Sequence, residues 1–172
     1  MSVAQGLIVR SFPPIARPDA RCLILGSMPG VASLNAGQYY AHPQNRFWPI
    51  MGHLLDFDVA QTPYIQRVAC LQQAGIAVWD VLQSCERAGS LDADIRRETQ
   101  VVNEFPAFFA AHPLITRVYF NGAHAEQVFK RWVLPVLPAA PRFRMVRLPS
   151  TSPAHASLTL EDKLAAWQQV IK

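Results

Sequence analysis

Four short apolar runs, each followed at once by Gly, Asp, Asn or Pro, constrain the fold of this chain more than any other feature. They are Arg21–Leu25, Ile76–Trp79, Arg117–Phe120 and Arg144–Leu148. Short apolar runs bounded by turn-forming residues are typical of buried β-strands. Helical patterns separate these runs, and parallel strands need crossover connections that are usually helices. The alternation therefore predicts a three-layer α/β/α fold with a mainly parallel four-stranded sheet.

The helical patterns between the runs consist of apolar residues spaced three and four positions apart. In Asn45–Leu55, this spacing joins Phe47, Ile50, Met51 and Leu54, and Asn45 is placed as the N-cap. Further helices are predicted over Tyr64–Ala74, Ile95–Ala111 with an interruption at Pro106, His124–Val133, and Leu160–Ile171. The last of these follows a Thr-Leu-Glu-Asp start that resembles a capping box.

The length and composition indicate one globular unit. A chain of 172 residues can bury a core and fits one α/β domain, so residues 1–172 are predicted to form a single domain. Charged residues are 16% of the chain and hydrophobic residues 51%, whereas a typical domain has about 25% charged residues. This composition excludes a disordered chain or a coiled coil. The 16 Lys and Arg residues exceed the 12 Asp and Glu residues, which is compatible with a polyanionic partner without requiring one.

The cysteines and histidines do not indicate a disulfide framework, a metal site or a cofactor. The three cysteines have no CxxC spacing and the five histidines have no HxxxH or HExxH spacing. We therefore expect no metal and no cofactor, and a reducing, cytoplasmic location. No stretch approaches the roughly 18 apolar residues of a membrane span, and Met1–Arg10 lacks the features of a secretory signal. We also expect a monomer.

The residues that follow the four predicted strands are the candidates for chemistry, because ligands of open α/β sheets bind beyond the carboxyl ends of the strands. The first strand leads into Gly26–Gly30 and then into a polar and aromatic segment, Tyr39–Trp48. The others lead into Asp80, Asn121 and Pro149–His155. The Gly26–Gly30 loop matches neither GxxxxGK[ST] nor GxGxxG. Its small residues, with serines opposite, suit a nucleic-acid backbone, and the aromatic rings suit a base.

Four sequence blocks resemble the uracil-DNA glycosylase superfamily, most closely its hypoxanthine (deoxyinosine) DNA glycosylase branch. In chain order they are GSMPGVASLNAGQYYAHPQNRFW, VWDVLQSCERAGSLDADI, VYFNGAHA and LPSTSPAHA. The resemblance extends from Leu23 to His155. It implies a monofunctional DNA glycosylase of base-excision repair, acting on double-stranded DNA with deaminated bases. Such an enzyme flips the base out of the duplex, and water then displaces it from C1′ without a lyase nucleophile.

The resemblance also implies roles for individual residues. Many members of the superfamily position the water from the first-strand loop, where this chain has Met28, an apolar residue that cannot orient water. The hypoxanthine branch uses the Asn of its HPxN segment, which is Asn45 here. Asp80 occupies the position at which many relatives read the base with Asn. Several relatives have His or Asn before the last Pro-Ser pair, where this chain has Leu148.

The chemistry of glycosidic cleavage is consistent with these roles. Positive charge develops on the sugar and negative charge on the departing purine, so the site needs a placed water and hydrogen-bond donors to the base. The Asn45 carbonyl could orient the water, although an amide is not a strong base. A buried Asp80 would have a raised pKa and could donate a hydrogen bond to N7 or O6 of the purine. In the structural alternative, Asn45 only caps a helix and Asp80 only forms a turn.

The remaining candidates are grouped by the part of the substrate that they would contact. The predicted catalytic residues are Asn45 and Asp80, and the predicted base-binding residues are Met28, Tyr40, Phe47, Asp80 and Asn121. The predicted DNA-binding residues are Ser27, Arg46, Ser150, Ser152 and His155, with His155 nearest the tip of the loop expected to wedge into the duplex. Two further functions stay open, a uracil-DNA glycosylase of the mismatch-specific type and a non-catalytic DNA- or nucleotide-binding module.

A group of charged residues between the second and third predicted strands is interpreted as a solvated face without function. Its members are Glu86, Arg87, Asp92, Asp94, Arg96 and Arg97.

Overall fold

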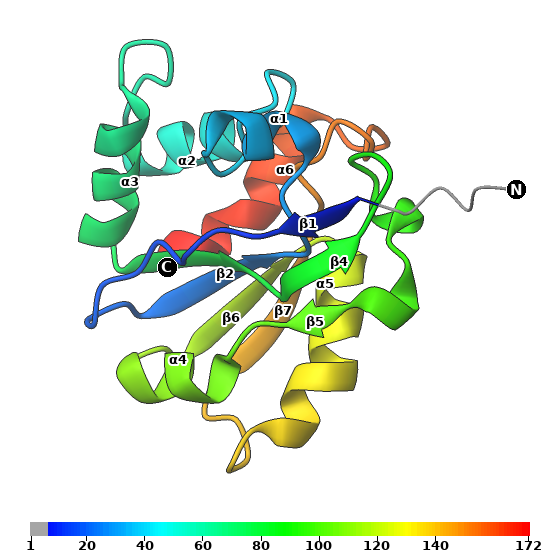
Figure 1. Cartoon of the computed structure of the whole chain (residues 1–172). Coiled ribbons are helices and arrows are strands. Elements are labelled where there is room, and N and C mark those ends of the chain that lie inside the picture. Colours follow the sequence, from blue (N-terminus) through cyan, green and yellow to red (C-terminus); the bar gives the residue numbers. More distant parts are fainter. Residues whose placement is uncertain (1–6) are drawn as a thin grey trace, which may run out of the picture.

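A four-stranded parallel sheet forms the centre of the protein, which we describe from a computed structural model over residues 7–172. Its strand order is β3-β2-β6-β7 (Figure 1). The strands are β2 (Cys22–Gly26), β3 (Ile76–Asp80), β6 (Arg117–Asn121) and β7 (Arg144–Leu148), and every neighbouring pair is parallel. The four predicted strands and the parallel sheet are therefore confirmed.

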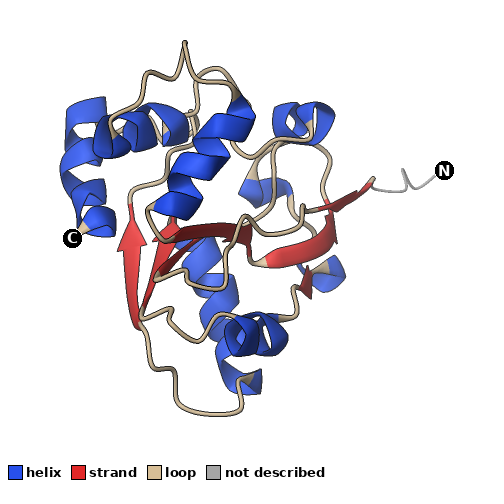
Figure 2. Cartoon of the chain, turned by 90° about the vertical axis from the view of Figure 1, so that its left-hand side faces the viewer, coloured by secondary structure: helices blue, strands red, loops and turns tan. Residues whose placement is uncertain are grey.

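Helices cover both faces of this sheet, because its strands are apolar on both sides. In β2, Ile24 packs into the core beneath one set of helices and Leu23 packs into the core on the opposite face. The first core includes residues of α2 (Phe47–Leu55), α3 (Tyr64–Gln73) and α6 (Leu160–Trp167), and the second includes residues of α4 (Phe105–Ala111) and α5 (Ala123–Val128). Figures 1 and 2 show this layering, with the short helix α1 (Val31–Ala36) above the sheet. The predicted three-layer α/β/α fold is confirmed.

Side-chain hydrogen bonds mark the starts of two helices, although the N-cap of α2 is Arg46 and not the predicted Asn45, which lies one residue earlier. Helix α2 begins at Phe47, two residues after Asn45, and the Asn45 Oδ1 accepts a hydrogen bond of 2.9 Å from the Phe47 backbone N–H. In α6, Thr159 and Asp162 form the predicted capping box through reciprocal hydrogen bonds of 3.1 and 3.2 Å. These contacts satisfy N–H groups of the first turn that have no partner within the helix.

A second, antiparallel sheet was not indicated by the sequence pattern. It has the order β1-β4-β5, formed by β1 (Ile8–Arg10), β4 (Leu82–Glu86) and β5 (Val101–Val102). Only Val81 separates β4 from β3. These strands are short, and β4 contains polar residues, so neither length nor hydrophobicity distinguishes them from loops.

The second sheet also makes one helix prediction wrong. Over Ile95–Ala111, the structure has a 3₁₀ turn at Arg97–Thr99, then β5, and the α-helix begins only at Phe105. Pro106 stands in the first turn of α4, where its missing N–H costs nothing. Just before it, the Asn103 Nδ2 donates to the carbonyl oxygens of Asp80 (2.8 Å) and Leu82 (3.3 Å). These tertiary hydrogen bonds hold the segment beside the sheet in an extended conformation.

The other predicted helices are present with altered ends. Helix α5 continues as a π-helical turn, Phe129–Val133, and α6 continues as a 3₁₀ turn, Gln168–Ile171. Within residues 7–172, no helix is both long and apolar enough to cross a membrane. The prediction about a secretory signal falls largely on residues 1–6, which lie outside the described residues. The division into a single domain stays a prediction.

Candidate active site

A cleft of about 530 Å³ lies at the carboxyl ends of the parallel strands. Nine of the predicted site residues line it, namely Ser27, Met28, Tyr40, Asn45, Asp80, Asn121, Ser150, Ser152 and His155. Arg46 and Phe47 do not line it. The cleft thus lies where parallel strand ends converge, and it collects segments that are distant in sequence.

Asp80, the last residue of β3, has a buried carboxyl group in this cleft. Its register partner across the sheet is Gly26, and its side chain is only 3% exposed. Its Oδ2 finds no hydrogen-bond partner within residues 7–172. The pKa of Asp80 is raised to about 7, mainly because burial disfavours the charged form and also because Asp92 lies nearby, while Arg87 opposes the shift. Near neutral pH this carboxyl group can therefore carry a proton and donate a hydrogen bond.

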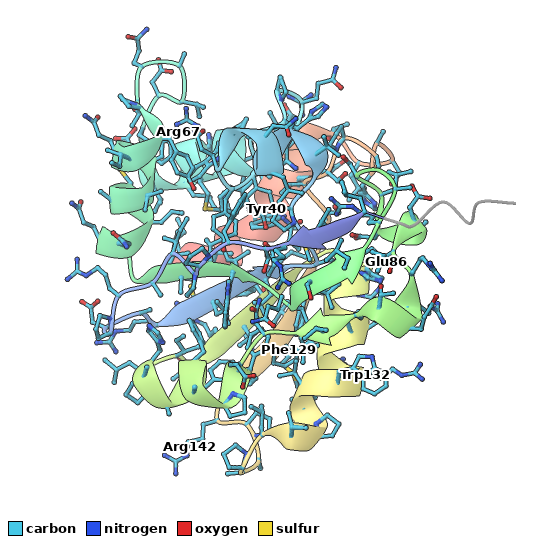
Figure 3. The ribbon with its side chains drawn as sticks, viewed as in Figure 1. Tyr40, Arg67, Glu86, Phe129, Trp132 and Arg142 are labelled. Atoms are coloured by element: carbon cyan, nitrogen blue, oxygen red, sulfur yellow. The ribbon has the colours of Figure 1, made fainter. Side chains whose placement is uncertain are left out.

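Tyr40 places a second buried polar group beside Asp80. Its backbone has φ 55°, a left-handed conformation that is strained for a bulky residue. Its ring stacks on Phe47 with a centroid distance of 4.1 Å, and it lies near the middle of the molecule between the upper helices and the sheet (Figure 3). The hydroxyl has no partner within residues 7–172, and burial followed by the Asp80 charge raises its pKa. The strained backbone thus aims a neutral hydroxyl group at the cleft.

Glycine at position 26 is required by the close approach of these two groups. A Cβ at this position would stand 2.7 Å from the Asp80 Oδ1 and 3.1 Å from the Tyr40 hydroxyl. The first distance is shorter than real Cβ contacts allow. The side chains of Asp80 and Tyr40 therefore pack close to the backbone of Gly26, where a larger residue would collide with them.

Replacing Gly26 with alanine should displace the Asp80 side chain. We expect Gly26→Ala to destabilise the fold by about 1–3 kcal/mol, as overpacking does, and to reduce the activity of this site strongly because the carboxyl group is moved. Urea denaturation and an activity assay would measure the two effects. Gly89→Ala is the matched control, because a Cβ there would meet only the Asp94 Oδ2 at 3.7 Å. A Gly26→Ala protein with unchanged stability and activity would contradict the crowded geometry.

Asn45 is half-buried, and its side-chain oxygen already accepts one hydrogen bond. Its Oδ1 accepts from the Phe47 N–H, as described above, which fixes the side-chain orientation. An amide oxygen has two acceptor sites, so a second site remains for a water in the cleft. The hydrogen bond from the Phe47 N–H and the predicted catalytic role of Asn45 are therefore compatible.

Phe47 needs correction as a predicted base contact, whereas the predicted DNA contact of Arg46 stays a prediction. Phe47 is fully buried and supports the Tyr40 ring from behind, so its own ring has no surface to offer a base. Arg46 is exposed outside the cleft, and its backbone N–H donates to the Thr151 carbonyl oxygen at 2.9 Å. That hydrogen bond joins the start of α2 to the last loop of the cleft.

Asn121 ties the end of β6 to the same loop. Its Nδ2 donates to the Thr151 Oγ1 and its Oδ1 accepts from the Thr151 backbone N–H, both at 2.9 Å. Each end of the amide therefore already has a partner, and Asn121 orients the loop that contains Ser150 and Ser152. Its predicted contact with the base stays a prediction.

Ser27 belongs to a cluster of three residues that the sequence did not indicate. The Ser27 hydroxyl, in a residue that is 7% exposed, donates to the Asp92 Oδ2 at 3.3 Å and lies 3.1 Å from the His124 Nδ1. Asp92 also lies 3.9 Å from His124. Asp92 lines the cleft with its side chain 46% exposed, so it is solvated as predicted but belongs to the candidate site. The connection between β4 and β5 brings it there, and no spacing in the sequence indicates this.

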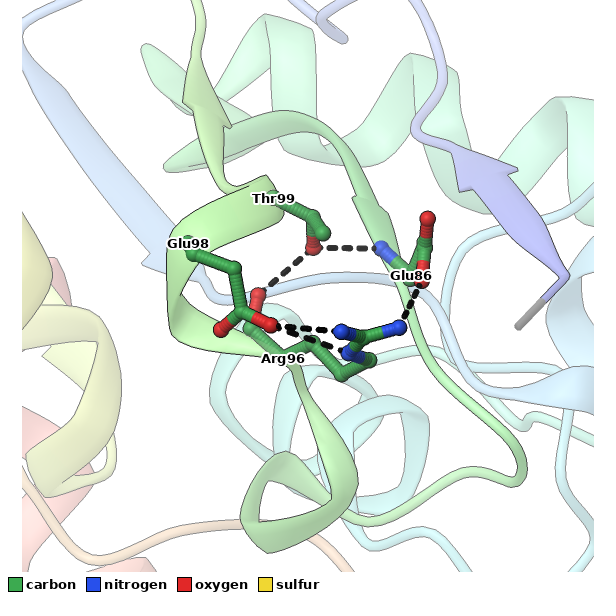
Figure 4. Close-up of polar contacts among 4 residues, drawn as sticks. All are labelled: Glu86, Arg96, Glu98 and Thr99. Carbon is green, nitrogen blue, oxygen red and sulfur yellow. Dashed lines mark hydrogen bonds and ion pairs between the residues drawn. The ribbon is translucent and has the colours of Figure 1, made fainter. Parts of the chain in front are cut away.

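The interpretation as a solvated face is wrong for Arg87 and correct for Arg96. Arg87 is only 2% exposed, and its guanidinium donates to the carbonyl oxygens of Met28, Pro29 and Gly89. It therefore supports the Gly26–Gly30 loop from inside the protein. Arg96 is exposed and forms ion pairs of 2.8 Å with Glu86 and with Glu98 (Figure 4).

No metal centre is evident in the described part of the chain. Across residues 7–172, no group of three or more His, Cys, Asp or Glu side chains could hold a metal ion. The buried and unpartnered groups of the cleft are a carboxyl and a hydroxyl, which suit hydrogen bonding to a polar ligand.

A three-layer α/β/α fold with a polar cleft at the carboxyl ends of its parallel strands is typical of ligand-binding and enzymatic domains of this class. The family model described as the uracil DNA glycosylase superfamily matches residues 13–171, and the chain belongs to this superfamily. The predicted DNA glycosylase class is thereby confirmed.

Individual relatives agree with this assignment. A hypoxanthine DNA glycosylase of Methanosarcina barkeri is 30% identical over 163 residues, covering 95% of this chain and 98% of the relative. A hypoxanthine DNA glycosylase of Methanosarcina acetivorans is 32% identical over 121 residues, covering 70% and 75%. The solution NMR structure of a Methanosarcina acetivorans protein assigned to the uracil DNA glycosylases has a TM-score of 0.77 at 27% identity, covering 96% of this chain and 100% of that one. The predicted resemblance to the hypoxanthine branch is confirmed by these relatives.

Proposed function

We propose that this protein is a deoxyinosine DNA glycosylase that hydrolyses the N-glycosidic bond and releases hypoxanthine from double-stranded DNA in base-excision repair. The observation that carries the proposal is the Asp80 carboxyl group, buried in the cleft with a free Oδ2 and a pKa raised to about 7. A protonated acid can donate to N7 or O6 of a departing purine, and the two relatives named hypoxanthine DNA glycosylases support this choice of base.

In the proposed mechanism, the protein stabilises charge and places a water molecule. Asn45, held by the Phe47 N–H, accepts a hydrogen bond from the water and directs its oxygen toward C1′. Asp80 donates to the purine as negative charge develops on it, and the water adds to the cationic sugar and loses its proton to solvent. The neutral Tyr40 hydroxyl lies beside Asp80 and supplies a second donor.

The flipped base is proposed to enter against Tyr40. Phe47 supports one face of the Tyr40 ring, so the ring is a rigid surface for stacking. Extruding a base costs a few kcal/mol, less at a mismatch such as inosine opposite thymine. Ser150, Ser152 and Arg46, beside the cleft, are proposed to hold flanking phosphates.

Excision from matched oligonucleotides tests the proposal. Duplexes carrying inosine, uracil, xanthine or no lesion are incubated with the protein and then treated with alkali, which cleaves abasic sites. Release from inosine above all others is expected. Preferred release of uracil would favour the uracil-DNA glycosylase, and binding of inosine DNA without any release would favour the non-catalytic module.

His155 is proposed as the residue that wedges into the vacated stack. It is exposed in the cleft loop, where its carbonyl oxygen accepts from the Lys163 Nζ at 2.8 Å. We expect His155→Ala to slow excision from a fully paired inosine duplex by roughly tenfold, because a wedge stabilises the opened stack. Single-stranded inosine DNA should be cleaved at the wild-type rate.

The matched control for this variant is His53→Ala, since His53 is an exposed histidine on α2 that does not line the cleft. Equal excision from the paired duplex by wild type and His155→Ala would remove the wedge role.

A further inference from the structure

A second hollow of about 190 Å³ lies outside the cleft, along α5 and the π-helical turn that follows it. We call it the α5 hollow. Arg97 and Gln100 line one side, and His124, Gln127, Arg131 and Trp132 line the helical side. No proposed step of the reaction uses these side chains.

On the helical side of the hollow, α5 and the following turn have a polar face whose side chains are not part of the hydrophobic core. His124, Gln127 and Arg131 are spaced three and four residues apart, so they lie along one face of the helix. Ala125 and Phe129, on the opposite face, are buried in the core beneath the sheet. The fold therefore leaves the polar face free to bind something else.

The charge in the α5 hollow is positive and uncompensated. Arg97 and Arg131 contribute two guanidinium groups, and no carboxylate lines the hollow. Neither arginine forms an ion pair within the described residues 7–172. By contrast, the basic residues that precede them in the chain have acidic partners. Arg96 pairs with Glu86 and Glu98, and Lys130 lies 3.6 Å from Glu126.

Trp132 fixes one of the two guanidinium groups. Its side chain is 49% exposed at the surface (Figure 3), and the Arg131 guanidinium lies 5.0 Å from the centre of its ring. An arginine held over an aromatic ring keeps its N–H edges available to an anion. Arg131 is thus oriented before a ligand binds, which reduces the entropy cost of binding.

The α5 hollow begins at the wall of the cleft. His124 lines the hollow, and its Nδ1 lies 3.1 Å from the Ser27 hydroxyl, which lines the cleft. The cleft and the hollow are therefore adjacent, separated by the contact between Ser27 and His124.

We propose that the α5 hollow is a second phosphate-binding site, in which Arg97 and Arg131 hold a backbone phosphate of the substrate DNA beyond the cleft. Arginine is well suited to this ligand because its planar group donates two parallel hydrogen bonds to phosphate oxygens. The site holds the duplex in register and takes no part in bond cleavage. The inference rests on the proposed function, because that function supplies the DNA.

The test compares Arg97→Ala, Arg131→Ala and the double variant with wild type. Binding to inosine duplex and to undamaged duplex is measured over a range of salt concentrations, and single-turnover excision is measured at saturating protein. Each single variant should weaken binding by roughly tenfold and lower the slope of log Kd against log salt by about 1, which is the loss of one phosphate contact. The saturated excision rate should stay at the wild-type value.

Arg142→Ala is the matched control, since Arg142 is an exposed arginine on a loop away from the α5 hollow (Figure 3). It removes the same charge and should leave the salt slope unchanged. A double variant with the Kd and the salt slope of wild type would overturn the proposal, as would an equal loss of slope in Arg142→Ala.

Two further arms separate the alternatives. In the first arm, inorganic phosphate is added and tryptophan fluorescence is measured in wild type and in Trp132→Phe. Quenching that is lost in Trp132→Phe, combined with unchanged DNA binding in the arginine variants, would overturn the DNA role. The hollow would then be assigned to small phosphates. Undamaged duplex makes the test independent of excision. If no lesion is excised but the arginine variants lose slope, the proposed excision activity fails and the phosphate site stands.

Discussion

Replacing Asn45 with alanine should reduce excision of hypoxanthine by roughly a hundredfold or more, comparable with the loss of one preorganised hydrogen-bonding group in other active sites. Asn45 lines the cleft and its Oδ1 is already fixed by the Phe47 N–H, so the water would lose an acceptor that needs no reorganisation. Single-turnover excision from an inosine duplex at saturating protein measures the effect. Binding of the duplex should change little, because the phosphate contacts remain.

The alanine variant also removes the hydrogen bond from the Phe47 N–H to the Asn45 Oδ1, and this second effect has to be separated. Losing this hydrogen bond should destabilise the fold by about 1 kcal/mol, which urea denaturation measures. Asn45→Ser is the matched control, because a serine hydroxyl can accept the same hydrogen bond from two residues on, but its shorter side chain does not reach as far into the cleft. We expect Asn45→Ser to recover stability without recovering activity. An Asn45→Ala protein that excises hypoxanthine at the wild-type rate would refute the role of this residue in placing the water.

Asp80 should impose an upper pH limit on excision. With its pKa raised to about 7 by burial and by Asp92, Asp80 donates a hydrogen bond below this pH and loses its proton above it. Wild-type excision should therefore fall as pH rises through 7. Asp80→Asn keeps a hydrogen-bond donor that does not ionise, so its excision rate should not decline around pH 7. At pH 6 its excision rate should be roughly tenfold below that of wild type. Asp80→Ala should lose activity at every pH.

The stability of the fold should follow the same titration. The pKa of Asp80 is higher in the folded than in the unfolded protein, whose ordinary value is 3.8. The folded protein then binds more protons between these two values, so the free energy of unfolding falls as pH rises from about 4 to about 7. Asp80→Asn should lack this decline, as urea denaturation at pH 4, 6 and 8 would measure. Excision that rises through pH 7 in wild type would mean that Asp80 acts as a carboxylate.

The parallel sheet could be predicted because buried parallel strands are apolar on both faces and are visible as local runs. The predicted run Arg144–Leu148 has the bounds of β7, and the predicted run Arg21–Leu25 differs from β2 by one residue at each end. The antiparallel sheet could not be predicted in this way. Strand β5 has two residues, and it forms because Val101 and Val102 pair with β4 across the intervening chain.

The residues of the candidate site also divide into those that the local sequence could indicate and those that depend on tertiary packing. Asp80 and Asn121 directly follow the predicted runs and end strands β3 and β6, so their convergence in one cleft could be inferred from the parallel arrangement of the strands. Arg87, Asp92 and His124 could not be assigned, because their contacts depend on how the connection between β4 and β5 packs against the Gly26–Gly30 loop. The burial of Phe47 is decided by packing as well, since its periodic spacing indicated a helix but not which aromatic ring would face the cleft.

By itself, the sequence determined the layer order, the edge of the sheet at which the cleft lies and the family to which the chain belongs, because hydrophobic runs, strand ends and ordered motifs are local features. Only the tertiary structure decided the raised pKa of Asp80 and the engagement of Ser27 by Asp92 and His124. Burial, desolvation and unpaired charge are properties of what surrounds a side chain, and those surroundings come from segments far away in the sequence.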